Sequence, residues 1–379
     1  MFLFGYTSRY EHVNRSTTGP TMSKYSKFWP KGGLPGILHH YTETLVTFEY
    51  TSSAAARKPH SLLFIGGLGD GLATTSYTAD LVRSLAPTEW SLFTINLTSA
   101  GQAWGVGHLD RDTDEIAQCV RYIKEYKAAK YGTGDKEAKV VLMGHSTGSQ
   151  CVLHYLYRPN PHTGTAPSFD PYLEHVERPA VDGAIMQAPV SDREAIHWVL
   201  KHGIGDRSPE SCREAYEAME ALAREAALKR ELDGAMLPLS LTDRIYPANT
   251  PISCRRFLSL VSPDSPDSPG EDDLFSSDLG EEQLSKTFGA VHKGGLLRHK
   301  LMVLHSGADQ SVPDHIDKQK LLDKWGDVAD RNGECQVWDR EHSGVIPNAS
   351  HALSNDDQAE PRQWLCKRVM SYLDTSVKV

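Results

Sequence analysis

The sequence predicts an α/β fold: a mostly parallel central sheet with helices on both faces and an inserted, mainly helical lid. Short apolar runs typical of buried strands alternate with stretches of helical periodicity. The alternation stops near residue 192 and resumes near residue 300, and the block between carries helical patterns of its own. Strands that alternate with helices favour a parallel sheet covered on both faces, because each crossover lies against the sheet.

The strands are predicted from apolar runs that end at glycine or at polar turns. Residues 37–40 and 45–50 are expected to form a first pair of strands. Buried strands are expected next at residues 61–65, 91–97, 139–143 and 184–187. Helices are expected between them at residues 73–85, 112–126 and 148–157. The pattern resumes with strands at residues 300–305 and 336–338 and a final helix at residues 358–373.

The block at residues 192–299 is predicted to be the lid. Helices are expected from Asp192 to His202, and from Pro209 onward because proline is well tolerated at the first helical position. Residues 262–283 hold eight acidic and no basic residues, interspersed with proline and serine, so we expect a flexible, solvated loop. The predicted organisation is an irregular N-terminal arm, a core in two parts and the lid, at residues 1–34, 35–191 with 300–379, and 192–299.

Composition narrows the classes of function. The formal net charge is −9, but without the eight acidic charges of residues 262–283 it is about −1, and there is no basic footprint for nucleic acid. The six cysteines show no metal-ligand spacing, and no apolar run approaches the roughly 20 residues of a membrane-spanning helix. We expect a cytoplasmic protein that needs no metal or cofactor and has no nucleic-acid or membrane partner. The oligomeric state stays open.

A serine motif at the end of a predicted strand indicates a nucleophile. The apolar residues 140–143 lead into residues 144–148, GHSTG, and helical periodicity begins directly afterwards. In α/β-hydrolases such a G-x-S-x-G turn holds the serine in a strained conformation, and the flanking glycines leave room for it. A glycine-rich turn with a capping serine is the alternative. The strand, motif and helix in succession favour Ser146 as nucleophile of an α/β-hydrolase fold.

A serine nucleophile needs a base, and the base needs an orienting acid, which follow the serine in that fold in the order acid, histidine. Asp309 lies just past a predicted strand, where ligands bind in such sheets, and Asp192 is the rival acid. His351 lies between the last predicted strand and the final helix, in a loop expected to reach Ser146. His342 is the rival base, and we expect it at the surface. The predicted triad is Ser146, Asp309 and His351.

Backbone N–H groups are expected to complete the site. The N–H of Thr147, at the start of a helix, is predicted to point at the developing oxyanion. Leu68, in the glycine-rich residues 66–71, is predicted to supply the second donor. Gly67, Trp104 and His145 are predicted to lie at the substrate, and His145 is also expected to pack behind the serine turn.

These residues predict a serine hydrolase that acts on esters through an acyl-enzyme. A generic carboxylesterase, a lipase and a peptidase remain open, because the lid sets the specificity. A non-catalytic binding protein is an alternative from another class, since a fold does not fix a function.

Several motifs together resemble the fungal siderophore esterases. They are GGLGDG at residues 66–71, Trp104-Gly105, GHSTGSQ at 144–150, APVSDREA at 188–195, LHSGADQSVP at 304–313 and the Asn-Ala-Ser-His at 348–351. The resemblance spans most of residues 35–373. It implies an intracellular enzyme that cleaves ester bonds of fusarinine-type hydroxamate siderophores such as fusarinine C, so that iron is released. It also implies the triad Ser146, Asp309 and His351, with iron arriving as part of the substrate.

Overall fold

The protein is described here from a computed structural model, which places residues 30, 33–51, 57–132, 138–162, 170–171, 173–232 and 234–377. The predicted irregular arm at residues 1–34 lies almost wholly outside the described residues. Among the described residues, no helix is both long enough and apolar enough to cross a membrane.

The core is one sheet of eight strands in the order β1-β2-β4-β3-β5-β6-β7-β8. The strands are β1 (Gly36–His40), β2 (Val46–Tyr50), β3 (His60–Ile65), β4 (Trp90–Ile95), β5 (Val140–His145), β6 (Gly183–Gln187), β7 (Leu301–Ser306) and β8 (Gly344–Ile346). The pairs β1/β2 and β2/β4 are antiparallel, and all later pairs are parallel. The predicted mostly parallel sheet is therefore confirmed. Its parallel strands are buried along their length, which is why they read as continuous apolar runs in the sequence.

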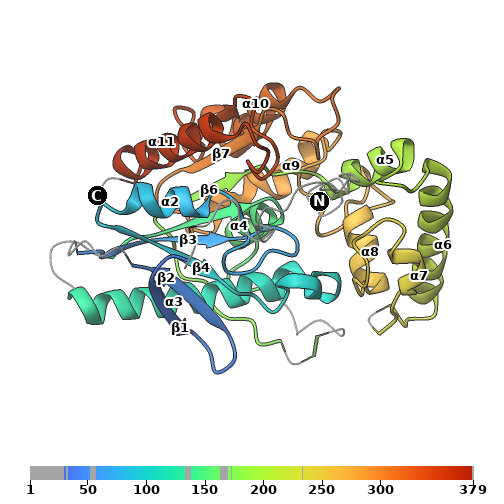
Figure 1. The fold of residues 1–379 in the computed structure, drawn as a ribbon, viewed down its shortest axis with the longest axis horizontal. Coiled ribbons are helices and arrows are strands. Elements are labelled where there is room, and N and C mark those ends of the chain that lie inside the picture. The colour runs from blue at the N-terminus through green and yellow to red at the C-terminus, as the bar shows by residue number, and fades with distance from the viewer. Residues whose placement is uncertain are drawn as a thin grey trace, which may run out of the picture.

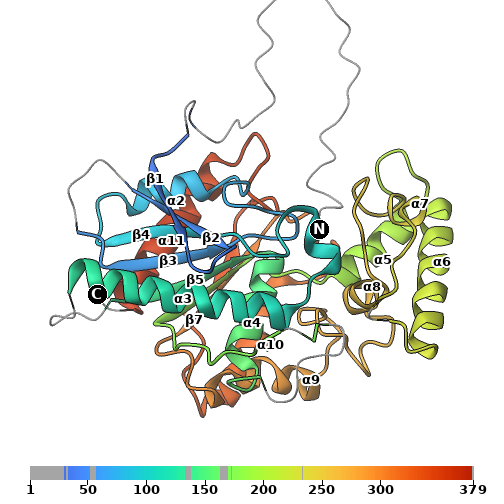
Figure 2. The same cartoon turned by 90° about the horizontal axis from the view of Figure 1, so that it is seen from below.

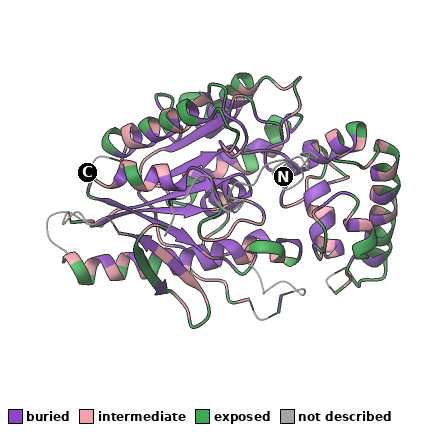
Figure 3. Cartoon of the chain, in the orientation of Figure 1, coloured by how far each residue is buried: buried purple, intermediate pink, exposed green. Residues whose placement is uncertain are grey.

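Helices cover both faces of the sheet (Figures 1 and 2). On one face, α2 (Thr78–Leu85) and α11 (Ala359–Thr375) pack over alternate residues of β3, β4 and β5. On the other, α3 (Leu109–Tyr131), α4 (Thr147–Tyr157) and α10 (Lys318–Ala329) pack over the residues between. The alternation of the two cores along each strand follows from the two-residue period of a strand. Figure 3 shows buried residues along the sheet and exposed ones on the outer sides of these helices.

The segment between β6 and β7 is mainly helical, and its first part forms a small core of its own. It contains α5 (Asp192–His202), α6 (Pro209–Leu228), α7 (Leu239–Thr242) and α8 (Cys254–Val261), which lie together beyond one end of the sheet (Figure 1). Val199, Met219 and Phe257 are fully buried among these helices. Leu68 and Trp104, from loops of the sheet domain, join the same cluster. The helices therefore pack onto the loops that carry the predicted site.

The acidic residues 262–283 differ from the expected solvated loop. Residues 263–269 are largely exposed, but Asp272 and Asp273 are buried in ion pairs with arginines. Leu274 and Phe275 then enter the main core beside the sheet. The loop prediction was wrong for this second half because the neutralising arginines are remote in sequence. The chain returns along the core through α9 (Glu281–Lys286) before it reaches β7.

The last strand also differs from the prediction. The strand lies at residues 344–346, and residues 336–338 contribute only an isolated bridge between Trp338 and Leu301. The N–H groups of Val337 and Trp338 donate instead to one carboxylate oxygen of Asp330, so they do not extend the ladder. A polar side chain that competes for backbone N–H groups ends a strand, and this effect is not visible in an apolar pattern.

A buried ion pair fixes α3 to the antiparallel edge of the sheet. The Nζ of Lys127 lies 2.6 Å from a Glu49 carboxylate oxygen, and both side chains are essentially inaccessible to solvent. The ammonium also donates to the Lys58 carbonyl and the Ser91 hydroxyl, at 2.7 and 3.0 Å. Burial lowers the pKa of Lys127 to about 8, although the Glu49 charge acts in the opposite direction.

We expect Lys127→Met to lower the free energy of unfolding by about 3–5 kcal/mol, because it leaves Glu49 buried without its partner. Urea unfolding followed by circular dichroism measures the change. Lys130→Met, on the exposed side of the same helix, is the control and should alter stability by less than about 0.5 kcal/mol. Equal effects of the two substitutions would contradict the role given to the ion pair.

Candidate active site

Ser146 occupies a strained turn between β5 and α4. Its backbone has φ 63° and ψ −122°, a conformation that residues other than glycine rarely adopt. A Cβ on Gly144 would lie 2.1 Å from the Gly148 carbonyl oxygen, and one on Gly148 would lie 2.3 Å from the Ile65 carbonyl oxygen. The prediction that both flanking positions must be glycine is confirmed. The Ser146 N–H donates to the Gln187 carbonyl at 2.8 Å, which fixes the turn against β6.

The structure brings the predicted base and acid together. His351 Nδ1 lies 2.7 Å from Asp309 Oδ2, and both side chains are buried. Burial alone would raise the pKa of Asp309, but the His351 charge and hydrogen bond, together with the Ser311 N–H, bring that pKa below its ordinary value. An ionised Asp309 therefore holds the proton of His351 on Nδ1 and leaves Nε2 as the basic nitrogen.

The basic nitrogen of His351 has no hydrogen-bond partner among the described residues. The Ser146–His351 hydrogen bond of the predicted triad is therefore not formed in this arrangement. Such bonds are often long before substrate binds, so the geometry is that of a resting site. The ring of His351 lies 5.1 Å, centroid to centroid, from that of His145, the residue before the serine, which places the base beside the turn.

Neither Asp192, the rival acid, nor His342, the rival base, takes the place of Asp309 or His351 in the site. Asp192 begins α5 and accepts a hydrogen bond from the Gln150 amide at 3.1 Å. His342 is buried, against the expectation of a surface residue, and its Nδ1 lies 3.0 Å from the Asp339 carboxylate. It precedes the last strand, because that strand lies later in the chain than predicted.

The glycine-rich loop after β3 passes directly beside the serine. A Cβ on Gly67 would lie 2.8 Å from the Ser146 hydroxyl oxygen, so only glycine leaves space there. The Gly67 N–H donates to Asp70 at 2.8 Å, and this bond shapes the turn that continues into Leu68. Thr147 is the first residue of α4, so its N–H has no partner in a preceding turn. Leu68 and Thr147 line the same cavity, and their roles as oxyanion donors stay predictions.

A buried glutamine that no sequence motif singles out connects the parts of the site. The side-chain oxygen of Gln187 accepts from the Tyr77 hydroxyl at 2.8 Å and from His145 Nδ1 at 2.6 Å. Its amide nitrogen donates to the Ser306 hydroxyl, which in turn donates to the His351 carbonyl, at 3.0 and 3.3 Å. Since the Gln187 backbone also holds Ser146, one residue contacts the serine turn and, through Ser306, the base.

Burial and the bond to Gln187 determine the protonation state of His145. Burial lowers the pKa of His145 to about 3, so the ring is neutral and donates from Nδ1 to Gln187. His145 therefore lies behind the serine as a fixed, uncharged ring, in line with the expected packing role. Its predicted contact with substrate stays a prediction.

Gly67 and Trp104 line a small cavity behind the glycine-rich loop. Its other walls include Leu68, Thr147 and the buried Arg256, and its volume is about 30 Å³, roughly that of one water molecule. The Trp104 carbonyl accepts from Arg256 Nε at 3.1 Å, and Arg256 is ion-paired with Asp272. Trp104 therefore connects the predicted site to the helical segment that follows β6.

The strained serine at the end of β5, at the carboxyl edge of a mostly parallel sheet, defines an α/β-hydrolase fold. A solved structure, siderophore hydrolase EstB from Aspergillus fumigatus, superposes with a TM-score of 0.83 at 65% sequence identity, covering 93% of this chain and all of that one.

Residues 24–374 match a family described as a protein of unknown function, DUF1749, and the chain belongs to this family. It is 68% identical to fusarinine C esterase sidJ of Aspergillus fumigatus, over 93% of this chain and 99% of that protein. It is 48% identical to esterase AN6793 of Emericella nidulans, over 91% of this chain and 93% of that protein.

We expect Asp309→Asn to lower the free energy of unfolding at neutral pH by about 1–3 kcal/mol, because it removes an ionised partner of His351. The pKa of Asp309 in the folded protein lies below that of an unfolded aspartate, about 3.9, so its contribution is present above that pH and is lost as the pH falls. The difference from the unsubstituted protein should therefore shrink below about pH 4.

Urea unfolding at a series of pH values measures this difference. Asp374→Asn, an exposed position on α11, is the control and should change stability by less than about 0.5 kcal/mol throughout. A deficit in Asp309→Asn that is the same at acidic and neutral pH would contradict the electrostatic account.

Proposed function

We propose that the protein is a serine esterase in which Ser146, Asp309 and His351 form the catalytic triad. The observation that carries the proposal is the strained Ser146, with a buried imidazole–carboxylate pair placed beside it. A capping serine would not need a backbone of positive φ, and such strain persists in proteins mainly at functional sites.

The proposed reaction follows from these positions. The Ser146 hydroxyl attacks the ester carbonyl while His351 Nε2 takes its proton, and Asp309 stabilises the imidazolium that forms. The N–H groups of Leu68 and Thr147 donate to the oxyanion of the tetrahedral intermediate. The alcohol leaves with the proton from His351, and an acyl-enzyme remains. Water, deprotonated by the same nitrogen, then releases the acid and restores the serine.

The proposed substrate is an ester of the fusarinine type, fusarinine C in particular, whose cleavage releases its bound iron inside the cell. Support comes from the 68% identity to a fusarinine C esterase over nearly the whole of both chains, and from the fold shared with a siderophore hydrolase. The 30 Å³ cavity beside the glycine-rich loop is far too small for such a ligand. The proposal therefore includes a wider opening between that loop and the helices α5–α8 when substrate enters.

We expect Ser146→Ala to abolish ester cleavage, lowering kcat by more than about 10⁴-fold, because no other hydroxyl replaces the nucleophile. Products from ferric fusarinine C, iron-free fusarinine C and short-chain aryl esters are measured by mass spectrometry. Ser149→Ala is the matched control and should remain active. Ser149 is a buried serine of α4, the helix that follows Ser146, and it donates to the Gln187 and Gly144 carbonyls.

The outcomes separate the candidate functions. Cleavage of aryl esters without cleavage of either fusarinine C form would leave a generic carboxylesterase. Full turnover by Ser146→Ala would contradict the proposed nucleophile. A protein that cleaves no ester and is not labelled at Ser146 by a fluorophosphonate would be a binding protein.

We also expect Gln187→Met to lower kcat by about 10- to 100-fold with a much smaller change in KM, because His145 in the serine turn and Ser306, which holds the His351 carbonyl, lose the side chain that joins them. Steady-state kinetics on an aryl ester measure this. Gln150→Met is the matched control: Gln150 is equally buried and hydrogen-bonded, but its partners are Asp192 and the Asp272 carbonyl. If both variants lose the same activity, Gln187 acts only through general stability.

A further inference from the structure

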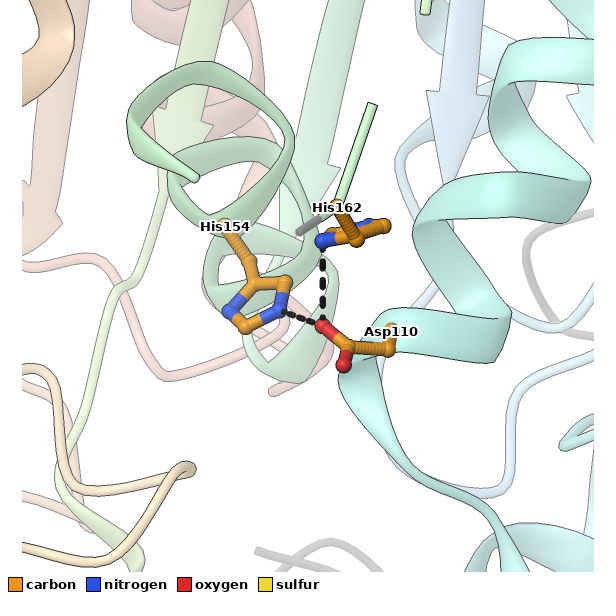
Figure 4. A group of neighbouring side chains, drawn as sticks. All are labelled: Asp110, His154 and His162. Atoms are coloured by element: carbon orange, nitrogen blue, oxygen red, sulfur yellow. Dashed lines mark hydrogen bonds and ion pairs between the residues drawn. The ribbon is translucent and has the colours of Figure 1, made fainter. Parts of the chain in front are cut away.

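Two histidines and an aspartate converge away from the proposed catalytic site (Figure 4). Asp110 lies in the first turn of α3, His154 lies near the end of α4, and His162 lies in the segment that follows α4. Asp110 Oδ1 is 2.7 Å from His154 Nε2 and 3.3 Å from His162 Nδ1. The two histidine side chains are almost wholly buried, and Asp110 is only slightly exposed.

A further carboxylate lies beside one of these three ligands, but its oxygen is not within 4.8 Å of all of them, so it must turn toward a bound ion. Glu271 Oε1 lies 3.6 Å from His154 Nε2. Ligand atoms bound tetrahedrally at about 2.0–2.1 Å from a zinc ion lie about 3.3 Å apart, and the three measured separations fall on either side of that value. Two imidazoles and carboxylates are a ligand set suited to divalent transition metals.

We propose that Asp110, His154 and His162, with Glu271 as the fourth ligand, form a structural site for a divalent transition metal such as Zn²⁺. The site would join the start of α3, the end of α4 and the segment that returns from the inserted helices. It stands independently of the proposed esterase chemistry, because none of its residues belongs to the triad or to the oxyanion loop.

The groups behind the two imidazoles suit this role. The Tyr157 hydroxyl lies 3.2 Å from His154 Nδ1, so it can accept that N–H when Nε2 binds the metal. Thr113 Oγ1 lies 3.1 Å from His162 Nε2, and its own proton is donated to the Leu109 or Asp110 carbonyl. Each ring can thus turn a lone pair to the metal and keep a partner for its other nitrogen, as metal-binding histidines usually do.

Binding must displace what now satisfies these atoms. Asp110 is the acceptor that both ring nitrogens face, so binding must shift the proton of each neutral imidazole to its other nitrogen. Arg158 Nη2 lies 3.5 Å from Asp110, and Arg178 Nη1 lies 2.8 Å from His162 Nε2. Arg178 Nη1 also lies 3.3 Å from His162 Nδ1, the proposed ligand atom, so it has to move away from both ring nitrogens, while its Nη2 keeps the Arg158 and Pro159 carbonyls at 2.6 and 2.7 Å.

An open cavity gives the metal a route to the site. Asp110 and Glu271 both line a cavity of about 460 Å³, with Arg255 and His108 on its walls. A second group of ligand type, Asp114 with His162 and His175, shares His162 and lies on its other side. The first group is favoured because it has the fourth carboxylate and the cavity.

The test uses full-length, untagged protein from which metal has been removed with a chelator. Isothermal titration with Zn²⁺ is expected to show saturable binding of one ion per chain, and Co²⁺ is expected to give the visible absorption of a tetrahedral N/O site. Asp110→Asn, His154→Gln and His162→Gln are each expected to weaken binding by about 100-fold or more. Zn²⁺ should also raise the melting temperature of the unsubstituted protein, in proportion to its occupancy.

His175→Gln is the matched control, since His175 Nδ1 bonds to Asp114 and its ring only packs against that of His162, 4.9 Å away between centroids. It should bind Zn²⁺ as tightly as the unsubstituted protein. Absence of saturable Zn²⁺ and Co²⁺ binding to the unsubstituted protein would overturn the proposal, whatever the folding of the variants. Binding that is lost in His175→Gln and kept in His154→Gln would overturn it as well, by placing the ion in the neighbouring group.

Discussion

The positive φ of Ser146 is the constraint on which the rest of the site depends. The turn that gives Ser146 this φ must have glycine at positions 144 and 148. The backbone of α4 passes within contact distance of the ends of β3 and β5 there and leaves no space for a Cβ atom. That closeness brings the glycine-rich loop after β3 against the serine hydroxyl. The strain is maintained by the sheet, since the Ser146 N–H is held by the β6 carbonyl of Gln187.

His351, the proposed base, lies in a loop that the sheet alone does not position. The residues before α11 are held by side chains: Gln358 accepts from the Ser350 N–H and donates to the Asn348 carbonyl, and Gln310 accepts from the His351 N–H. Asp309 then fixes the ring, and Gln187 supports it through Ser306. The Ser350–Gln358 and Asp309–His351 bonds are buried, where an unsatisfied polar group is costly, so they favour one arrangement of the loop.

The sequence sufficed to predict the features that depend on local pattern. The parallel strands are buried on both faces and therefore read as apolar runs, and the G-x-S-x-G motif needs only its own strand and helix to be recognised. Asp309 and His351 followed from chain order once the fold was assigned. Sequence-based prediction failed where the partner of a residue is distant in the chain. Asp272 and Asp273 were predicted to be solvated, because nothing near them in the sequence shows that Arg256 and Arg193 pair with them in the fold.

The same reason explains the other differences. The end of the pattern at residues 336–338 is set by Asp330, whose carboxylate takes backbone N–H groups that a strand would use. His342 looked peripheral because Ser371 and Tyr372, which bury it, are close to it only in the folded chain. Gln187 could not be selected because nothing local distinguishes a glutamine that links three elements from one that merely ends a strand.

The return of residues 274–288 through the main core affects how the inserted segment can be exchanged between related proteins. Leu274, Phe275 and Phe288 are buried with Trp325 of α10, so they belong to the folding unit of the sheet although they follow the inserted helices in the chain. Only the part up to α8 is built around its own separate cluster. A chimaera that grafts a foreign specificity segment would therefore need its second junction just after residue 261, and a junction near residue 299 would remove part of the host's own interior.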